Sequence, residues 1–287
     1  MGLLMDAPPQ QISTPARGNG KTQLMQTPSN AMIDIASVSK TYNTSQRGSH
    51  LALDDVNLTI NEGEFVSILG PSGCGKSTLL YMVGGFVKVS AGSITVKGAP
   101  VTGPGPDRGP VFQEFALFPW KTVLENVMYG PLEQGMPKKE AAAWARQLLT
   151  MVHLAKYESF YPKELSGGMK QRVALARTLA YKPNILLMDE PFGALDAYTR
   201  TRLQNELLDI WERDRKTVMF ITHSVEEAVF LSDRVYVMTP SPGHIRKVYE
   251  IDLPRPRVRS ELLLDRRYQD YVVSIERLLD EQDKEFA

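Results

Sequence analysis

Residues 64–80 read EFVSILGPSGCGKSTLL, an apolar run that leads into a glycine-rich turn and then into a helix-forming stretch. Within it, residues 70–77 match the pattern G-x-x-x-x-G-K-[ST], and residues 65–69 supply the strand that has to precede this pattern. Small residues let backbone N–H groups curl around phosphate oxygens, and a helix from Thr78 points its positive end at the same anion. The stretch predicts a phosphate-binding P-loop. A glycine-rich turn that binds no nucleotide is the alternative.

Two side chains of this loop carry the expected chemistry. Lys76 is expected to reach the β- and γ-phosphates, and the Ser77 hydroxyl is expected to bind Mg²⁺. Alkylation of Cys74 inside the loop is expected to inhibit the chain, and bound nucleotide is expected to protect it. The residues predicted to bind the nucleotide are consecutive: Gly70, Pro71, Ser72, Gly73, Cys74, Gly75, Lys76, Ser77 and Thr78.

The composition is that of an ordinary globular protein. Hydrophobic residues make up 43% of the 287 residues and charged residues 23%, and 33 Lys and Arg balance 33 Asp and Glu. No global field therefore attracts nucleic acid or anionic lipid. The single cysteine excludes an internal disulfide and suits a reducing compartment, and no apolar run is long enough to span a bilayer. We expect a cytoplasmic protein whose link to a membrane goes through a partner.

Along the chain, the hydrophobic pattern predicts an α/β protein. Residues 1–30 are rich in Pro, Gln, Thr, Ser and Gly and are expected to form a disordered arm. Strand patterns dominate residues 31–112 apart from the P-loop helix, and helical patterns follow at residues 123–150. The predicted layout is a parallel core that carries two insertions. Three later apolar runs read as buried parallel strands: ILLMD at 185–189, TVMFIT at 217–222 and RVYVMT at 234–239.

Two acidic residues follow the first of these late strands. Asp189 ends the ILLMD run and Glu190 comes directly after it. A carboxylate at the end of a buried strand beside the P-loop strand can bind Mg²⁺, and the next carboxylate can polarise an attacking water as general base. We therefore expect Asp189 to be a metal ligand and Glu190 to be catalytic. The alternative is that the two acids merely end a strand.

The stretch ELSGGMKQRVALARTLA at residues 164–180 supplies a second anion-binding helix start. Ser166, Gly167 and Gly168 come before a helix-forming run, so their hydroxyl and N–H groups can face an anion. Together with the two nucleotide motifs, this stretch resembles the ATP-binding subunits of ABC transporters, in which LSGG is the signature motif. Met169 stands where that family often has glutamine, and the serine and both glycines are kept. A soluble P-loop kinase is excluded most strongly by this stretch.

The resemblance covers residues 32 to about 252, and it implies ATP as the nucleotide and roles for further residues. Tyr42 would stack on adenine. Gln113, at the end of the VFQ strand, would approach Mg²⁺ and the attacking water. Asp196, in the GALD sequence, would lie near a subunit interface.

A histidine follows the TVMFIT strand and completes the predicted catalytic set. His223 precedes a helix in which Ser224 and Glu227 have the spacing of a capping box. An isolated histidine is more often structural, but the resemblance implies that His223 contacts the γ-phosphate and holds the water against Glu190. The expected catalytic residues are therefore Lys76, Glu190 and His223.

The resemblance also implies an architecture and an assembly. The implied fold is a P-loop NTPase (RecA-like) parallel core over residues 31–252, with an antiparallel β subdomain and a helical insertion subdomain at about residues 114–180. Two chains, identical or closely related, would face head to tail around two ATP molecules. The Ser166, Gly167 and Gly168 segment would then complete the partner's site, and one twofold axis would generate both sites.

The C-terminal residues 253–287 are expected to form a helical extension. Tyr268, Val272, Ile275 and Leu279 make an apolar stripe at helical spacing, which predicts a helix packed on the core. A dimer contact or a regulatory contact of this helix is the alternative.

An aromatic stretch, QEFALFPW at residues 113–120, places apolar surface on a loop. It suggests a groove for a short helix of a membrane partner, and burial between the core and the helical insertion would also explain it. Together with residues 232–245, the stretch resembles the ATPases of importers for nitrate, sulfonate, taurine and related small anions.

That branch implies a set of partners and a location. The partners would be two transmembrane permease subunits and, through them, an extracytoplasmic solute-binding protein. The chain would lie at the cytoplasmic face of the inner membrane as a peripheral subunit. An exporter ATPase remains an alternative, as does an ABC-type ATPase acting on nucleic acid, against which the neutral charge and single P-loop argue.

Overall fold

The computed structural model describes residues 30–44, 48–193 and 195–286. The predicted N-terminal arm lies outside these residues except for Asn30, and so does the alanine of the GALD sequence.

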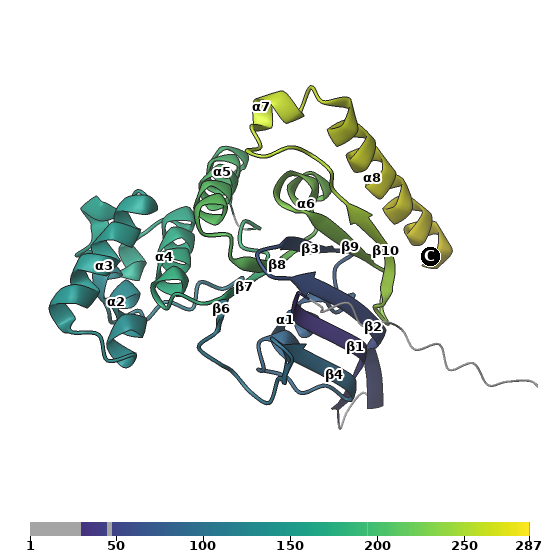
Figure 1. The fold of residues 1–287 in the computed structure, drawn as a ribbon, viewed down its shortest axis with the longest axis horizontal. Helices are drawn as coiled ribbons and strands as arrows, with labels where there is room; N and C mark the ends of the chain where they lie inside the picture. The colour runs from purple at the N-terminus through teal and green to yellow at the C-terminus, as the bar shows by residue number, and fades with distance from the viewer. Residues whose placement is uncertain (1–29, 45–47, 194, 287) are drawn as a thin grey trace, which may run out of the picture.

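A six-stranded sheet forms the core (Figure 1). In spatial order its strands are β10 (Ile245–Glu250), β9 (Arg234–Met238), β3 (Phe65–Leu69), β8 (Thr217–Thr222), β7 (Ile185–Asp189) and β6 (Arg108–Val111). All neighbours pair in parallel except β10 and β9, which pair antiparallel. Every residue of β3, β7 and β8 is buried, as expected of parallel strands covered on both faces. The predicted parallel α/β core is confirmed.

A second, antiparallel sheet packs against the first (Figure 1). Its strands, in spatial order, are β2 (Gly48–Asn61), β1 (Ala31–Thr44), β4 (Ala91–Val96) and β5 (Ala99–Pro100). Buried side chains of this sheet, such as Ile33 and Leu53, belong to the same hydrophobic cluster as Val66 of β3 and Met219 of β8. The two sheets therefore share one core, which also takes up helix α1 (Lys76–Val83).

Three helices form a lobe at one side of the molecule (Figure 1): α2 (Val123–Glu133), α3 (Lys138–Met151) and α4 (Gly167–Ala180). Short 3-10 turns at Ala155–Tyr157 and Pro162–Glu164 connect α3 to α4. A reciprocal capping box between Thr122 and Glu125 starts α2. Pro137 is the N-cap of α3. The division of the chain into a core, a helical subdomain and an extension stays a prediction.

Two further helices cover the parallel sheet: α5 (Ala197–Asp214) and α6 (Val225–Leu231). After β10 the chain continues into α7 (Arg259–Leu262) and α8 (Arg266–Phe286), which runs along the outside of α6 and β10 (Figure 1). Tyr268 and Ile275 of the predicted stripe are buried in the main core cluster, and Val272 and Leu279 pack against it. The predicted terminal helix therefore packs on the core.

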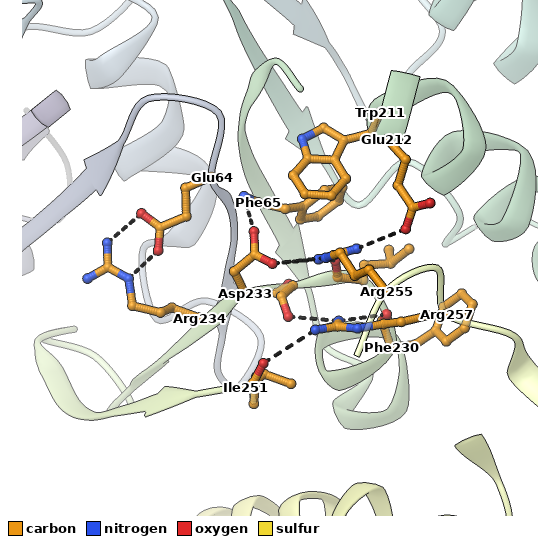
Figure 2. Close-up of polar contacts among 12 residues, drawn as sticks. Glu64, Phe65, Trp211, Glu212, Phe230, Asp233, Arg234, Ile251, Arg255 and Arg257 are labelled. Atoms are coloured by element: carbon orange, nitrogen blue, oxygen red, sulfur yellow. Dashed lines mark hydrogen bonds and ion pairs between the residues drawn. The ribbon is translucent and has the colours of Figure 1, made fainter. Parts of the chain in front are cut away.

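The segment 251–258, which we call the strap, joins β10 to α7, and arginine side chains bind it to the core (Figure 2). The Arg255 guanidinium donates to Asp233 Oδ1 at 2.7 Å and lies 4.3 Å from the ring centroid of Trp211. Asp233 Oδ2 accepts from the backbone N–H of Phe65 at 2.9 Å. The strap is therefore linked by a single side chain to the first residue of β3, the strand that leads into the P-loop.

Over the ranges that the structure describes, the helices are either too short or too polar to be membrane spans.

Candidate functional site

The P-loop connects β3 to α1 through glycines with left-handed backbone. Gly73 has φ 79° and Gly75 has φ 97°, values that side chains rarely adopt. A Cβ atom on Gly75 would lie 2.5 Å from Leu53 Cδ2 of β2, so the close side chain and the left-handed backbone both favour glycine there. The helix begins at Lys76, two residues before the predicted start at Thr78. The first turn of α1 thus points its free N–H groups at the loop, which fits a phosphate.

The side chain of Lys76, the first residue of α1, folds back into the P-loop and is buried there. Its side chain is 5% exposed, and Nζ donates to the carbonyl oxygens of Gly70 and Pro71, both at 2.8 Å. A third, weaker contact reaches Cys74 Sγ at 3.9 Å. A buried ammonium needs such partners to offset its desolvation. The loop therefore holds a positive charge in the cradle where a phosphate would bind.

Ser77 and Asp189 lie together, as the sequence predicts for metal ligands. Ser77 Oγ donates to Asp189 Oδ1 at 2.9 Å, and Tyr81 Oη donates to Asp189 Oδ2 at 2.9 Å. Asp189 is 1% exposed, and burial raises the pKa of its carboxyl. Burial, with the hydrogen bond to Asp189, also raises the pKa of Tyr81 to about 12, so this phenol remains a donor.

The Ser77 hydroxyl and the Asp189 carboxylate suit Mg²⁺ that is also bound by a nucleotide, and they are too few to hold a metal ion by themselves. In the parts of the chain described, no three His, Cys, Asp or Glu side chains come together as a metal cage. One hydroxyl and one carboxylate are what Mg²⁺ takes from a protein when nucleotide phosphates and waters supply the rest. Ser77 and Asp189 could therefore hold Mg²⁺ with a bound nucleotide.

Glu190 and His223 face each other at the carboxyl ends of neighbouring strands. Glu190 follows β7, His223 follows β8, and Glu190 Oε2 lies 3.3 Å from His223 Nδ1. Glu190 has φ 44°, a left-handed conformation that is uncommon outside glycine and frequent at functional sites. The imidazole is half exposed. The carboxylate and the imidazole can thus both contact one water, for which Glu190 is the proton acceptor.

The predicted capping box after His223 is only half formed. Ser224 Oγ accepts from the backbone N–H of Glu227 at 3.3 Å, as predicted. The returning bond is missing, because the Ser224 N–H donates instead to Thr222 Oγ1 at 3.0 Å. The Glu227 carboxylate is buried and faces Thr222 and Gln204. This part of the capping-box prediction is wrong, because a local spacing rule does not account for a buried partner on another helix.

Tyr42 reaches the site from the antiparallel sheet. Its Oη lies 3.4 Å from Thr78 Oγ1 in the first turn of α1, and the Lys40 Nζ lies 4.9 Å from the centroid of its ring. The ring is 37% exposed and is therefore available for stacking.

Gln113 lies two residues beyond the end of β6, in a loop rather than in the predicted strand. It is exposed, and its side chain makes no hydrogen bond with any residue whose placement the structure describes. The residue before it, Phe112, packs on Tyr81 with ring centroids 6.1 Å apart. The loop thus starts next to the side chain that donates to Asp189.

The signature residues and Asp196 lie at helix starts of their own. Ser166 is the N-cap of α4, where its Oγ accepts from the Met169 N–H at 3.3 Å. Asp196 is the N-cap of α5, and its hydrogen bonds with Thr199 lower the pKa of its carboxyl. Within residues 30–44, 48–193 and 195–286, no hydrogen bond or ion pair joins the signature segment or Asp196 to the P-loop. One chain therefore assembles the P-loop, the acidic pair and His223, and leaves the signature segment apart.

Two contributors to the site were not predicted from the sequence. Tyr81 stands four residues after Ser77, so helical spacing places both on one face of α1 and could have indicated a shared partner. Leu53, which lies against Gly75, comes from a strand far away in the sequence and leaves no local signal.

The Cys74 thiol is 1% exposed, and burial raises its pKa. Because the thiolate is the reactive form, burial slows the alkylation that the sequence analysis expects to inhibit the chain. We expect iodoacetamide to modify Cys74 in the native protein at least about tenfold more slowly than in the urea-unfolded chain, measured by mass spectrometry. Equal rates in the two states would contradict this burial.

A groove lies between the loop after β6 and α4. Its volume is about 350 Å³, and its walls include Phe86, Phe112, Phe118, Arg177 and Tyr181. The apolar stretch 113–120 therefore lines a groove on one side.

Two aromatic side chains of this stretch behave differently. Phe118 packs on Tyr129 with ring centroids 4.7 Å apart, and the buried Asn126 side chain bonds its backbone N–H and carbonyl. Trp120 is 71% exposed. The burial interpretation therefore holds for Phe118, whereas Trp120 is exposed and the docking of a partner stays a prediction.

Known proteins with similar sequences include ATP-binding proteins of ABC transporters. A family model described as ABC transporter matches residues 53–193. An uncharacterized ABC transporter ATP-binding protein of Methanocaldococcus jannaschii is 54% identical over 74% of this chain and 79% of its own length. In Synechocystis sp., a nitrate import ATP-binding protein is 50% identical over 77% of this chain and 83% of its own length. A bicarbonate transport ATP-binding protein of the same organism is 49% identical over 83% of this chain and 85% of its own length.

A solved structure has a similar fold. It is the dimeric structure of a post-hydrolysis state of an ATP-binding cassette bound to ADP and Pi, with a TM-score of 0.70 and 35% identity. The match covers 78% of this chain and all of that one.

Proposed function

This chain belongs to the ABC transporter ATP-binding family and is an ATPase, and on that premise we propose that it drives the import of a small anion. The observation that carries the proposal is the joint placement of Lys76, the Ser77–Asp189 pair and the Glu190–His223 pair at one edge of the sheet. Each of these groups has a separate task in phosphoryl transfer.

The chain's own residues supply positioning and charge. Lys76 neutralises the β- and γ-phosphates of ATP from within the P-loop, and the α1 N-terminus adds backbone N–H donors. Glu190 accepts a proton from the attacking water, and His223 holds that water in line with the γ-phosphate. Tyr42 stacks on the adenine, and Gln113 approaches the metal and the water.

We propose that Ser77 and Asp189 hold Mg²⁺ together with the nucleotide. When bound, Mg²⁺ supplies positive charge to the phosphate oxygens. The Tyr81 hydroxyl, which donates to Asp189, orients that carboxylate toward Ser77.

We propose that two chains form a head-to-tail dimer in which each signature segment completes the partner's site. Within the described part of one chain, Ser166 makes no hydrogen bond with the P-loop. This supports the arrangement, because the backbone N–H groups at the start of α4 are then available to a nucleotide bound by the partner chain. Asp196 would lie near the subunit interface, and one twofold axis would generate two equal sites.

The direction and the cargo of transport are inferred from the relatives. Those that are named import nitrate or transport bicarbonate, both small anions. We propose that two transmembrane permease subunits bind this chain at the cytoplasmic face of the inner membrane, and that a solute-binding protein selects the anion. An exporter remains the second possibility.

The test is transport by the assembled complex. The chain would be purified with the membrane proteins that accompany it and placed in vesicles with ATP outside and a solute-binding protein inside. Accumulation of nitrate, bicarbonate or a sulfonate inside these inverted vesicles would contradict import, whereas ATP-dependent loss of the anion from the lumen is the expected result. Co-purification of nucleic acid instead of membrane proteins would overturn the transporter assignment.

Trp120 offers a test of the docking surface. We expect Trp120→Ala to weaken co-purification with the membrane subunits and to lower transport by about tenfold or more, since exposed tryptophans are frequent anchors of interfaces. The basal ATPase of the isolated chain is expected to stay unchanged. Leu264→Ala, which removes an apolar side chain that is 84% exposed elsewhere, serves as the matched control. Normal assembly and transport by the Trp120 variant would exclude this surface.

A further inference from the structure

A buried carboxylate in the first turn of α6 fixes the backbone around His223. Glu227 is 6% exposed, and one of its oxygens accepts from Gln204 Nε2 at 2.7 Å. The other accepts from the Thr222 hydroxyl, whose Oγ1 in turn accepts from the Ser224 N–H at 3.0 Å. The residues on both sides of His223 are therefore held by one carboxylate.

The same hydrogen-bond chain continues into the C-terminal part of the protein. Gln204 of α5 is 2% exposed, and its Oε1 accepts from Arg259 Nη1 at 2.9 Å. Arg259 also donates to Glu226 Oε2 at 3.2 Å, and its guanidinium lies 5.5 Å from the ring centroid of Phe230. Arg259 is the first residue of α7. The start of the C-terminal helices thus reaches the peptide group between His223 and Ser224 through three buried side chains, those of Gln204, Glu227 and Thr222.

The strap and α8 hold the rest of α6. Arg257 is 6% exposed, and its Nη1 donates to the carbonyls of Val229, Phe230 and Ser232 at 3.1, 2.9 and 2.8 Å (Figure 2). A cation is favourable at this end of a helix, although burial lowers the pKa of Arg257 to about 10. The Tyr268 hydroxyl of α8 donates to the carbonyl of Glu226 at 3.4 Å. Both ends of α6 are therefore bound to residues 257–268.

We propose that Glu227 and Gln204 are positioning residues for His223, and that Arg259 makes the position of His223 depend on the C-terminal segment. This inference rests on the proposed function, in which His223 contacts the γ-phosphate. The C-terminal segment then acts on hydrolysis without touching the nucleotide.

The network is sensitive because its members are buried and satisfied by one another. Removing the Glu227 carboxylate leaves the Gln204 amide and the Thr222 hydroxyl without their acceptor, and a buried unpaired group relaxes toward new partners. The movement passes to Ser224 and so to His223. A displacement of about 1 Å at a reacting group is enough to cost about 100-fold in rate.

Variants of Glu227 separate positioning from folding. We expect Glu227→Ala to lower kcat by about 10- to 100-fold and to change KM for ATP by less than about threefold, because Lys76 and Tyr42 are untouched. Glu227→Gln is expected to keep kcat within about threefold, since an amide can accept from Gln204 and donate to Thr222. Equal losses in the two variants, or a loss confined to KM, would overturn the positioning role.

A double-mutant cycle with His223 tests the route of the effect. In a His223→Ala background, Glu227→Ala should change the residual single-turnover rate by less than about twofold. The same large loss in both backgrounds would show that Glu227 acts on the fold in general and would overturn the inference. A different failure is distinguishable: if His223→Ala alone leaves hydrolysis unchanged, the proposed role of His223 is wrong, and the inference falls with it.

The link to the C-terminal segment has its own readout. We expect Arg259→Ala to lower kcat by about 3- to 10-fold and to shift the imidazole resonances of His223 in protein labelled with ¹⁵N-histidine. The four histidines make assignment simple, because His223→Ala removes one set of signals. Arg267→Ala, which removes an exposed arginine paired with Asp265, is the matched control and should change neither readout. An unmoved His223 signal in Arg259→Ala would overturn the link.

Discussion

Replacing Glu190 by glutamine is expected to lower kcat for ATP hydrolysis by about 10²- to 10⁴-fold. The carboxylate faces His223 at 3.3 Å from a left-handed backbone position, so the fold holds it in one orientation. An amide of the same size keeps the packing and loses the ability to take a proton. Phosphate release at saturating ATP and Mg²⁺ measures the effect.

The same variant also tests the dimer. ATP binding should persist, because Lys76 and the P-loop are unchanged, so light scattering after gel filtration with ATP and Mg²⁺ should show a dimer. Glu158→Gln, a surface acid paired with Arg146, is the control and should retain normal hydrolysis. A Glu190→Gln chain that stays monomeric under these conditions would contradict the head-to-tail arrangement.

Lys76→Ala is expected to lower kcat/KM for ATP by about 10²- to 10³-fold and to weaken nucleotide binding itself. The substitution removes the charge in the cradle and also the two 2.8 Å bonds that tie the side chain to the Gly70 and Pro71 carbonyls. Equilibrium titration with a fluorescent ATP analogue, followed by steady-state hydrolysis, separates the two losses.

Two further lysine variants sharpen this prediction. Lys76→Arg keeps the charge, but a planar guanidinium does not match a site built for a compact ammonium, so most of the loss should remain. Lys139→Ala removes an exposed lysine of α3 and should have no effect. Normal nucleotide affinity in Lys76→Ala would show that the P-loop charge does not contribute to binding.

The parts of the fold that local patterns determine were predictable from the sequence. Strands β3, β7 and β8 are continuous apolar runs because both of their faces are covered, and this leaves a signal in a few adjacent letters. The P-loop likewise lies in one stretch, with glycines where left-handed backbone is needed. The location of Asp189 and Glu190 at the edge of the sheet was predictable because both stand at the end of a buried strand.

Contacts between distant segments were not predictable in this way. Tyr81 donates to Asp189 across more than a hundred residues of sequence, and Leu53 meets Gly75 from another sheet. The Glu227 side chain points into the core because it bonds Gln204, which lies on a different helix. Such partners are chosen by the packing of whole elements, and no spacing rule within a single element specifies them.

Element ends were also displaced by one or two residues. The helix after the P-loop starts at Lys76, and β6 ends at Val111, before Gln113. Ends are set by which backbone groups find partners, so they depend on neighbouring segments as well as on propensity.

The contact of Leu53 with Gly75 determines which fragments of the chain could fold and bind ATP on their own. The close approach of the loop to β2, the link between Tyr42 and Thr78, and the core shared by both sheets all bind the antiparallel sheet to the nucleotide loop. A fragment beginning at Phe65 would contain every letter of the P-loop motif and would lack the wall against which the loop is shaped. We therefore expect the smallest fragment that binds ATP on its own to be larger than the motif and to include both sheets.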